Sequence, residues 1–119
     1  MNDTQETIAQ MKQLVDTYTK ERDWEQFYDA QSISTAMSIE ANELMELFVW
    51  ARKSELDSII SQKKTAVEFE LADVLFTLLI FCNKYDIDLT SAFTKKLVHN
   101  AKKYPIEKAR GNNKKYNEL

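Results

Sequence analysis

Glycine and proline are almost absent from this chain. Its 119 residues contain one glycine, Gly111, and one proline, Pro105, both near the carboxyl end. Tight turns and sheet connections draw heavily on these two residues, whereas helix interiors avoid them. The sequence therefore predicts an all-α fold of long helices joined by few sharp corners.

Apolar residues recur at helical spacing along most of the chain, beginning with Ile8, Met11 and Val15. The most apolar segment opens with a Thr65–Glu68 capping box, so we expect it to form the central helix of the bundle. We expect a four-to-five-helix bundle, with helices over residues 4–21, 31–53, 55–62, 65–85 and 89–104.

The length suits a single domain spanning residues 1–119. Residues 106–119 are basic and polar, which is typical of a flexible terminus. One helical layer of this size buries a limited core, and association of copies is a common supplement. We therefore expect the bundle to be completed by oligomerisation.

Composition argues against several kinds of partner. A net charge of -3 gives no case for binding a nucleic-acid polymer. The longest apolar run, Val74–Cys82, is too short to span a membrane. The single cysteine, Cys82, allows no internal disulfide, and the amino terminus lacks the pattern of a signal peptide. We therefore expect a cytoplasmic protein without a membrane partner.

Acidic residues recur three apart in two expected helices, where they share one helix side. The first set is Glu40, Glu43 and Glu46, and the second set, in the most apolar helix, is Glu70 and Asp73. The first set alone also fits a solvated acidic face. Acids in an apolar helix, however, are costly to bury unless they are paired or bound to metal.

Antiparallel packing of these two helices would bring two acid pairs together around a cation. Oxygen ligands suit Mg²⁺, with Mn²⁺ as a substitute. A di-iron site needs Glu-x-x-His motifs, and a zinc site needs several histidine or cysteine ligands. The chain has one histidine, His99, and one cysteine, so neither of these sites is expected.

Aromatic residues are concentrated between the first two expected helices, at Trp24, Phe27 and Tyr28. This segment has no clean period. It can form a hydrophobic plug against the bundle, or a platform on which a flat ligand such as a nucleobase stacks. Stacking of a base on an aromatic ring contributes roughly 1–3 kcal/mol.

The motif Glu40-Ala-Asn-Glu43 followed by Glu70-Leu-Ala-Asp73 resembles the MazG-like superfamily of all-α nucleoside triphosphate pyrophosphohydrolases. Further pieces resemble its dCTP pyrophosphatase branch. These pieces are Glu21–Phe27, Glu43–Trp50, Asn100 with Lys103-Tyr104-Pro105, and Arg110-Gly111 with Lys115-Tyr116. The resemblance extends over nearly the whole chain from Glu21.

This resemblance implies Mg²⁺-dependent hydrolysis of a nucleoside triphosphate, expected to be dCTP or a related pyrimidine nucleotide, to the monophosphate and pyrophosphate. Such an enzyme would cleanse the nucleotide pool. The resemblance also implies a homodimer or a dimer of dimers. The implied metal ligands are Glu40, Glu43, Glu70 and Asp73, with Glu46 supporting them or positioning the attacking water.

The resemblance assigns substrate contacts to three groups of residues. Trp24, Phe27 and Trp50 would line the base pocket, Asn100, Lys103 and Tyr104 would meet the sugar or phosphates, and Lys115 and Tyr116 would contact the substrate from a lid in the terminal segment.

The chain departs from the family pattern at a few positions. Ile39 precedes Glu40 at a position where other MazG-like members often have a second acid. The dCTP branch also commonly lacks this extra acid. Tyr28 and Thr77 replace the histidine and tyrosine that this branch often has, which leaves the preferred base and sugar open. The alternative function is a catalytically silent helical module that binds a nucleotide or a protein. The intact acids favour the enzyme.

Overall fold

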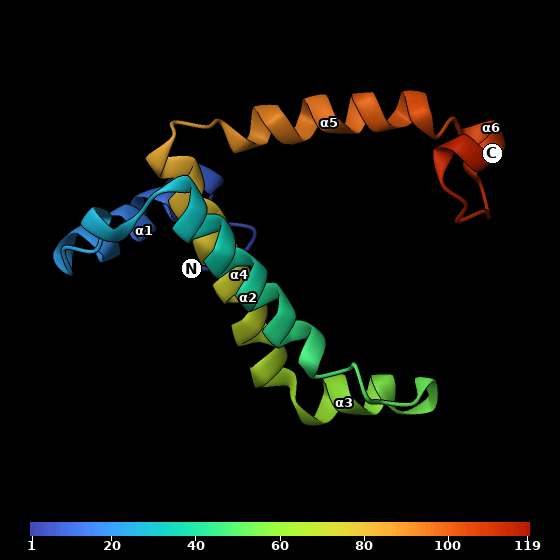
Figure 1. The fold of residues 1–119 in the computed structure, drawn as a ribbon, viewed down its shortest axis with the longest axis horizontal. Helices are drawn as coiled ribbons and strands as arrows, with labels where there is room; N and C mark the ends of the chain where they lie inside the picture. The colour runs from blue at the N-terminus through green and yellow to red at the C-terminus, as the bar shows by residue number, and fades with distance from the viewer. The chain divides into compact units, whose positions relative to one another are not determined.

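The computed structural model describes residues 1–119, and all of its regular structure is helical (Figure 1). The α-helices are α1 (Ile8–Glu21), α2 (Ala30–Glu46), α3 (Leu56–Gln62), α4 (Lys64–Lys84), α5 (Leu89–Lys103) and α6 (Ile106–Ala109). Short 3-10 helices lie at Glu25–Phe27, Lys53–Glu55 and Tyr116–Glu118. The all-α prediction is confirmed. None of these helices is both long enough and apolar enough to cross a membrane.

Two compact units make up the chain, Met1–Asp86 and Ile87–Leu119. The first unit contains α1 to α4, and the second contains α5, α6 and the last 3-10 helix. A single domain over residues 1–119 and its completion by further copies stay predictions.

Helix α4 is the centre of the first unit. Helix α2 lies along it, and α1 and α3 also contact it (Figure 1). The carboxyl-terminal half of α4 supplies Leu79, Ile80 and Cys82 to the buried core, which Val15 of α1 and Ile33 of α2 complete. The prediction that the helix over residues 65–85 is the central one is therefore confirmed.

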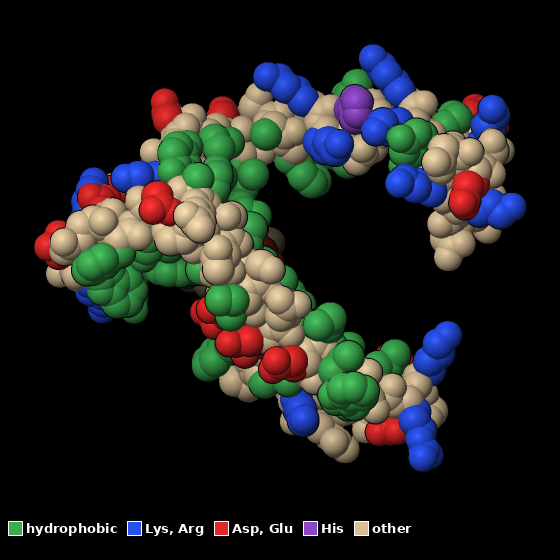
Figure 2. Space-filling view, viewed as in Figure 1, with side chains coloured by type: hydrophobic (Ala, Val, Ile, Leu, Met, Phe, Trp, Pro, Cys, Tyr) green, Lys and Arg blue, Asp and Glu red, His purple; other side chains and the backbone are tan.

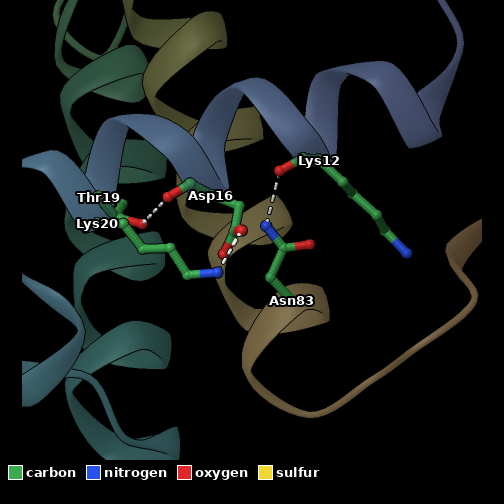
Figure 3. Close-up of polar contacts among 5 residues, drawn as sticks. All are labelled: Lys12, Asp16, Thr19, Lys20 and Asn83. Atoms are coloured by element: carbon green, nitrogen blue, oxygen red, sulfur yellow. Dashed lines mark hydrogen bonds and ion pairs between the residues drawn. The ribbon is translucent and has the colours of Figure 1, made fainter.

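A polar contact fixes α1 against α4 (Figure 3). The side-chain amide of Asn83 donates a hydrogen bond of 2.9 Å to the backbone carbonyl of Lys12. On α1 itself, Lys20 Nζ lies 2.7 Å from an oxygen of Asp16, and the buried Thr19 hydroxyl donates to the Asp16 carbonyl. Because Asn83 reaches one particular carbonyl of α1, the bond sets how far along α4 this helix lies.

Helix α1 begins at Ile8, so the predicted start near Thr4 is wrong. The Thr7 hydroxyl oxygen accepts a hydrogen bond from the Gln10 N–H at 3.2 Å, and Gln10 Oε1 accepts from the Thr7 N–H at 2.6 Å. This reciprocal capping box satisfies N–H groups that no helical carbonyl can reach. The box fixes the start of α1 more strongly than the apolar spacing does.

Helix α2 ends at Glu46, so the predicted end near Lys53 is wrong. Beyond Glu46 the backbone tightens, and the Phe48 N–H bonds to the carbonyl of Met45, three residues back, at 2.9 Å. Bonds of this span belong to 3-10 geometry, which frequently ends α-helices. As a result, Trp50 lies in the connection after α2 and not on the helix.

The predicted Thr65 cap of α4 is also wrong. Helix α4 begins at Lys64, and Lys63 alone separates it from α3. Thr65 therefore lies inside the first turn. No side chain caps this helix start, whereas Lys64 Nζ lies 3.7 Å from Glu68 one turn later. The tight junction with α3 leaves no room for a separate capping residue.

The sequence predicted the bounds of α3 and of α5 to within one residue. Asp88 caps α5 by accepting a hydrogen bond of 2.9 Å from the Ser91 N–H, and the helix ends at Lys103, just before Pro105. The short helix α6 after Pro105 was not predicted.

Replacing Thr7 with alanine should lower the free energy of unfolding by about 1 kcal/mol, because the cap loses its hydroxyl acceptor. Chemical denaturation followed by circular dichroism measures this change. Thr4→Ala is the matched control, since the Thr4 hydroxyl bonds only to Asn2, and it should cost less than about 0.5 kcal/mol. Equal losses in both variants would contradict the role of Thr7.

Candidate active site

Asp29 and Ser32 cap the start of α2, the helix that carries Glu40, Glu43 and Glu46. The Ser32 N–H donates to Asp29 Oδ1 at 2.7 Å, and the Asp29 N–H donates to the Ser32 hydroxyl at 3.0 Å. The bond from the Ser32 N–H is the main cause of a lowered pKa of Asp29. An anion at this place is favourable because helix amino termini carry partial positive charge.

Three carboxylates converge between α2 and α4. One ligand oxygen from each of Glu40, Glu43 and Glu70 lies within 4.8 Å of the other two. Glu40 and Glu70 are half-buried, and each has a buried Oε2 atom without a hydrogen-bond partner. Glu43 is exposed. We call these three residues the carboxylate cluster.

Asp73 and Glu46 lie close enough to act on the carboxylate cluster through their charge. Asp73 raises the pKa of both Glu40 and Glu70, and Glu46 raises the pKa of Glu70. Glu40, the first acid of its set on α2, is therefore near Asp73, the second acid on α4. Glu46, the last acid of the set on α2, is near Glu70, the first acid on α4. This pattern agrees with the antiparallel packing of α2 and α4 that the sequence predicts.

The protonation of the carboxylate cluster reflects burial and repulsion. Burial is the largest cause of the raised pKa of Glu40 and of Glu70, and the neighbouring charge of Glu43 is the next. Removing a carboxylate from water disfavours its ionised form, and a nearby like charge adds to this. The cluster thus lowers the stability of the chain while it has no counter-charge.

The donor atoms of the carboxylate cluster suit a hard divalent cation. All of them are carboxylate oxygens, the ligands that Mg²⁺ and Mn²⁺ prefer. A cation would satisfy the unpartnered oxygens of Glu40 and Glu70 and cancel the repulsion among the acids. Glu40, Glu43 and Glu70 are therefore the residues that could hold a metal ion, with Asp73 beside them.

A pocket of about 390 Å³ adjoins the carboxylate cluster through Asp73. Its volume lies within the usual range for small-molecule sites, about 300–1,000 Å³. The ring of Tyr18 meets those of Trp24 and Phe76 edge to face, with centroid distances of 5.8 and 5.6 Å. The lining residues are Leu14, Val15, Tyr18, Trp24, Ala72, Asp73 and Phe76. A flat ligand fits between the aromatic side chains of this pocket.

Of the three aromatic residues predicted to line a base pocket, Trp24 alone lines this one. Phe27 is 66% exposed and Trp50 is 93% exposed, and both lie outside its lining. Their roles as substrate contacts stay predictions. Tyr18 and Phe76 also line this pocket, and neither was predicted to do so. Phe76 follows Asp73 by three positions, so its place on the same helix side could have been found from spacing.

The C-terminal unit gathers the other predicted substrate residues into a basic aromatic group. Tyr116 meets Tyr104 edge to face at 6.2 Å, and the Nζ atoms of Lys103 and Lys115 lie 4.7 and 6.0 Å from the centre of its ring. Asn100 is half-buried, and its carbonyl accepts a hydrogen bond from the Tyr104 N–H. The end of the chain is therefore folded onto the end of α5.

Charge is divided unevenly along the chain. Residues 87–119 contain eight lysine and arginine residues and three acids, whereas residues 1–86 contain eight basic and sixteen acidic residues. Figure 2 shows several lysine and arginine side chains along α5 and α6. A unit of this charge attracts polyanions such as triphosphates.

Comparison with known proteins adds three findings. Residues 35–119 match the MazG-like family. The sequence is 34% identical to dCTP pyrophosphatase 1 of Rattus norvegicus and 33% identical to that of Homo sapiens, in each case over 95% of this chain and 68% of the relative. The fold resembles the crystal structure of a pyrophosphatase from Archaeoglobus fulgidus, with a TM-score of 0.80 and 28% identity over 88% of this chain and 98% of that one.

In the metal-free protein, Glu40 and Glu70 should contribute more to stability as the pH falls from neutrality toward 4.5. Because the pKa values of Glu40 and Glu70 in the folded chain lie above the ordinary value of 4.5, the folded state binds protons first. This contribution is complete below 4.5 and is lost as the pH rises through the raised values. Thermal denaturation in the presence of a chelator measures it.

Glu70→Gln should raise the melting temperature of the metal-free protein at pH 7 and weaken its dependence on pH. Glu68→Gln is the matched control on the same helix, because Glu68 lies 3.7 Å from Lys64 Nζ and its loss relieves no repulsion. The difference between the two variants cancels the titration of all other groups. A lower melting temperature for Glu70→Gln than for Glu68→Gln would contradict the repulsion argument.

Proposed function

The chain belongs to the MazG-like family, and on that premise we propose that it is a nucleoside triphosphate pyrophosphohydrolase. The relatives are dCTP pyrophosphatases, and the structural neighbour is a pyrophosphatase. The observation that supports the proposal most strongly is the position of Asp73. This residue acts on the carboxylate cluster and also lines the aromatic pocket, so a nucleotide could place its phosphates and its base in adjoining sites.

The cofactor that we propose is Mg²⁺, with Mn²⁺ as a substitute. Glu40, Glu43 and Glu70 would hold the ion, and Asp73 would be the fourth carboxylate. When bound, such an ion neutralises phosphate charge and lowers the pKa of the attacking water.

The chain itself would position the water and the triphosphate. In the proposed reaction, a water oxygen forms a bond to the α-phosphorus, and the bond from this phosphorus to the oxygen that bridges to the β-phosphate breaks. Pyrophosphate leaves with that oxygen. Glu46 is exposed beside Glu70, and we assign it the role of orienting the water and accepting its proton.

The substrate that we propose is dCTP or a related pyrimidine nucleotide, in keeping with the relatives. Its base would stack on Trp24 in the aromatic pocket. Phe27 and Trp50 are the other proposed contacts of the base, and both are exposed in connections between helices. Asn100, Lys103, Tyr104, Lys115 and Tyr116 keep their proposed roles as contacts of a sugar or of phosphates.

We further propose a homodimer or a dimer of dimers. Large apolar side chains of the first unit remain exposed in a single chain, including Phe69 at 66% and Trp50 at 93%. Exposed apolar surface of this kind marks contact with other molecules. The single cysteine, which is free, fits a cytoplasmic protein that cleanses the nucleotide pool.

Incubation with a panel of nucleoside triphosphates and Mg²⁺ should release pyrophosphate and no orthophosphate. Asp73→Asn and Glu43→Gln should each lower kcat by roughly 100-fold or more, because each removes a carboxylate that would help to hold the cation that balances the charge of the triphosphate. Circular dichroism should show both variants folded, and Glu68→Gln should keep its activity. If no nucleotide yields pyrophosphate with Mg²⁺ or Mn²⁺, the proposal fails and the catalytically silent module is favoured.

Mg²⁺ should raise the melting temperature of the wild-type protein, because a ligand that binds only the folded state stabilises it. The increase should largely disappear in Glu70→Gln and persist in Glu68→Gln. Differential scanning fluorimetry over a series of Mg²⁺ concentrations measures it. Melting that is insensitive to Mg²⁺ and Mn²⁺ in the wild type would contradict the metal site.

A further inference from the structure

Two residues other than glycine have a positive φ angle, Asp23 at 53° and Asp86 at 52°. This left-handed region is uncommon for residues with side chains, and aspartate is one of the types that tolerate it. Asp23 follows the end of α1 and directly precedes Trp24, the predicted base-stacking residue that lines the pocket beside Asp73. The conformation of Asp23 therefore bears on where this ring lies.

Asp23 ends α1 with a Schellman motif. Its N–H donates to the carbonyl of Lys20 at 3.0 Å, and the N–H of Trp24 donates to the carbonyl of Thr19 at 3.0 Å. The motif requires a left-handed residue at this position and often brings the next side chain against the last turn of the helix. That contact is present here, since Trp24 meets Tyr18 edge to face at 5.8 Å.

Gln26 stabilises the turn at Asp23 through its side chain. Its side-chain amide donates to Asp23 Oδ2 and to the Asp23 carbonyl, both at 3.0 Å. The carbonyl of Trp24 accepts a hydrogen bond of 3.0 Å from the Phe27 N–H, which starts the short 3-10 helix. The backbone of Trp24 is therefore tied at both its N–H and its carbonyl, whereas its side chain is 38% exposed.

We propose that Asp23 is a positioning residue for the substrate, and that its left-handed backbone holds the Trp24 ring where the nucleobase stacks. The inference rests on the proposed function. A residue that prefers right-handed or extended backbone would break the Schellman bonds and release Trp24 from Tyr18. The carboxylates of Glu40, Glu43 and Glu70 lie on α2 and α4 and would stay in place.

Three variants separate the backbone of Asp23 from its side chain. Asp23→Asn tolerates the left-handed conformation and keeps a side-chain acceptor for Gln26. Asp23→Gly tolerates the conformation but keeps only the backbone carbonyl as an acceptor for Gln26. Asp23→Val disfavours the conformation, because its side chain is β-branched. Pyrophosphate release at several nucleotide concentrations measures kcat and KM for each.

The asparagine variant should keep KM within about twofold of the wild type, and the glycine variant should remain close to it. The valine variant should raise KM roughly tenfold, which corresponds to the loss of one stacked ring, with little change in kcat. A fall in kcat without a change in KM would overturn the proposal. If the valine variant does not fold, Asp23→Ala strains the same angle more mildly and replaces it.

A double variant tests whether Asp23 acts through Trp24. Trp24→Ala should raise KM by itself, and adding Asp23→Val should raise it no further, because the ring that Asp23 positions is already gone. Effects on KM that multiply in the double variant would show that Asp23 acts by another route, and they would overturn the proposal.

Tryptophan fluorescence provides a readout that needs no turnover. In a Trp50→Phe background, Trp24 is the only tryptophan, and Asp23→Val should shift its emission to longer wavelength and increase its quenching by acrylamide. Asp86→Val is the matched control, since it strains an equivalent angle elsewhere and should lower the melting temperature without moving this emission.

The two readouts distinguish the two hypotheses. If the emission shifts but no nucleotide is hydrolysed by the wild type, the proposed function fails while the link from Asp23 to Trp24 stands. If nucleotides are hydrolysed and Asp23→Val leaves both KM and emission unchanged, the positioning role is overturned and the proposed function stands.

Discussion

The repulsion among carboxylates that face one another across α2 and α4 is the constraint that the rest of the structure has to offset. Glu40, Glu43 and Glu70 lie within a few ångströms of one another, and two of their oxygens are buried without partners. Such an arrangement opposes folding unless other contacts offset it. Those contacts lie further along α4, where Leu79 and Ile80 are buried against the neighbouring helices. One helix thus stabilises the unit with one half and presents acids with the other.

The aromatic wall depends on a different kind of support. Tyr18, Trp24 and Phe76 come from three elements, and none of the three is fully buried. Their arrangement follows from hydrogen bonds at the end of α1 and from the polar tie between Asn83 and Lys12. The acids are therefore held by paired helices, and the aromatic rings by helix ends. These two supports can respond separately to substitution.

Periodicity predicted the parts of this molecule that depend on helix geometry. Spacings of three placed Glu40 with Glu43 and Glu70 with Asp73, and the apolar content of residues 65–85 identified the central helix. The spacing of apolar residues did not predict the helix ends that depend on local hydrogen bonds. Thr7 and Thr4 are both plausible caps in sequence, and Gln10 decides between them only once its side chain folds back.

The pocket was harder to predict than the acids, because its wall is assembled from contacts that are distant in sequence. Tyr18 continues the helical spacing of the apolar residues Ile8, Met11 and Val15, which predicts a place in the core. Only its contact with Phe76, 58 positions later, places it at the pocket. Trp50 was predicted to lie in the last turn of a helix. The α-helix changes to 3-10 geometry before Trp50, and its ring is exposed.

The uneven division of charge has a practical consequence for handling the protein. With a pI near 5.2, the chain is expected to bind anion-exchange resins, yet its last 33 residues have a strong excess of positive charge. Cation exchangers, heparin and carried-over nucleic acid can therefore retain it at low ionic strength. The distance over which charges act on one another, the Debye length, falls to about 10 Å at 0.1 M salt. Salt concentration should thus be held constant whenever affinities for polyphosphates are compared between preparations.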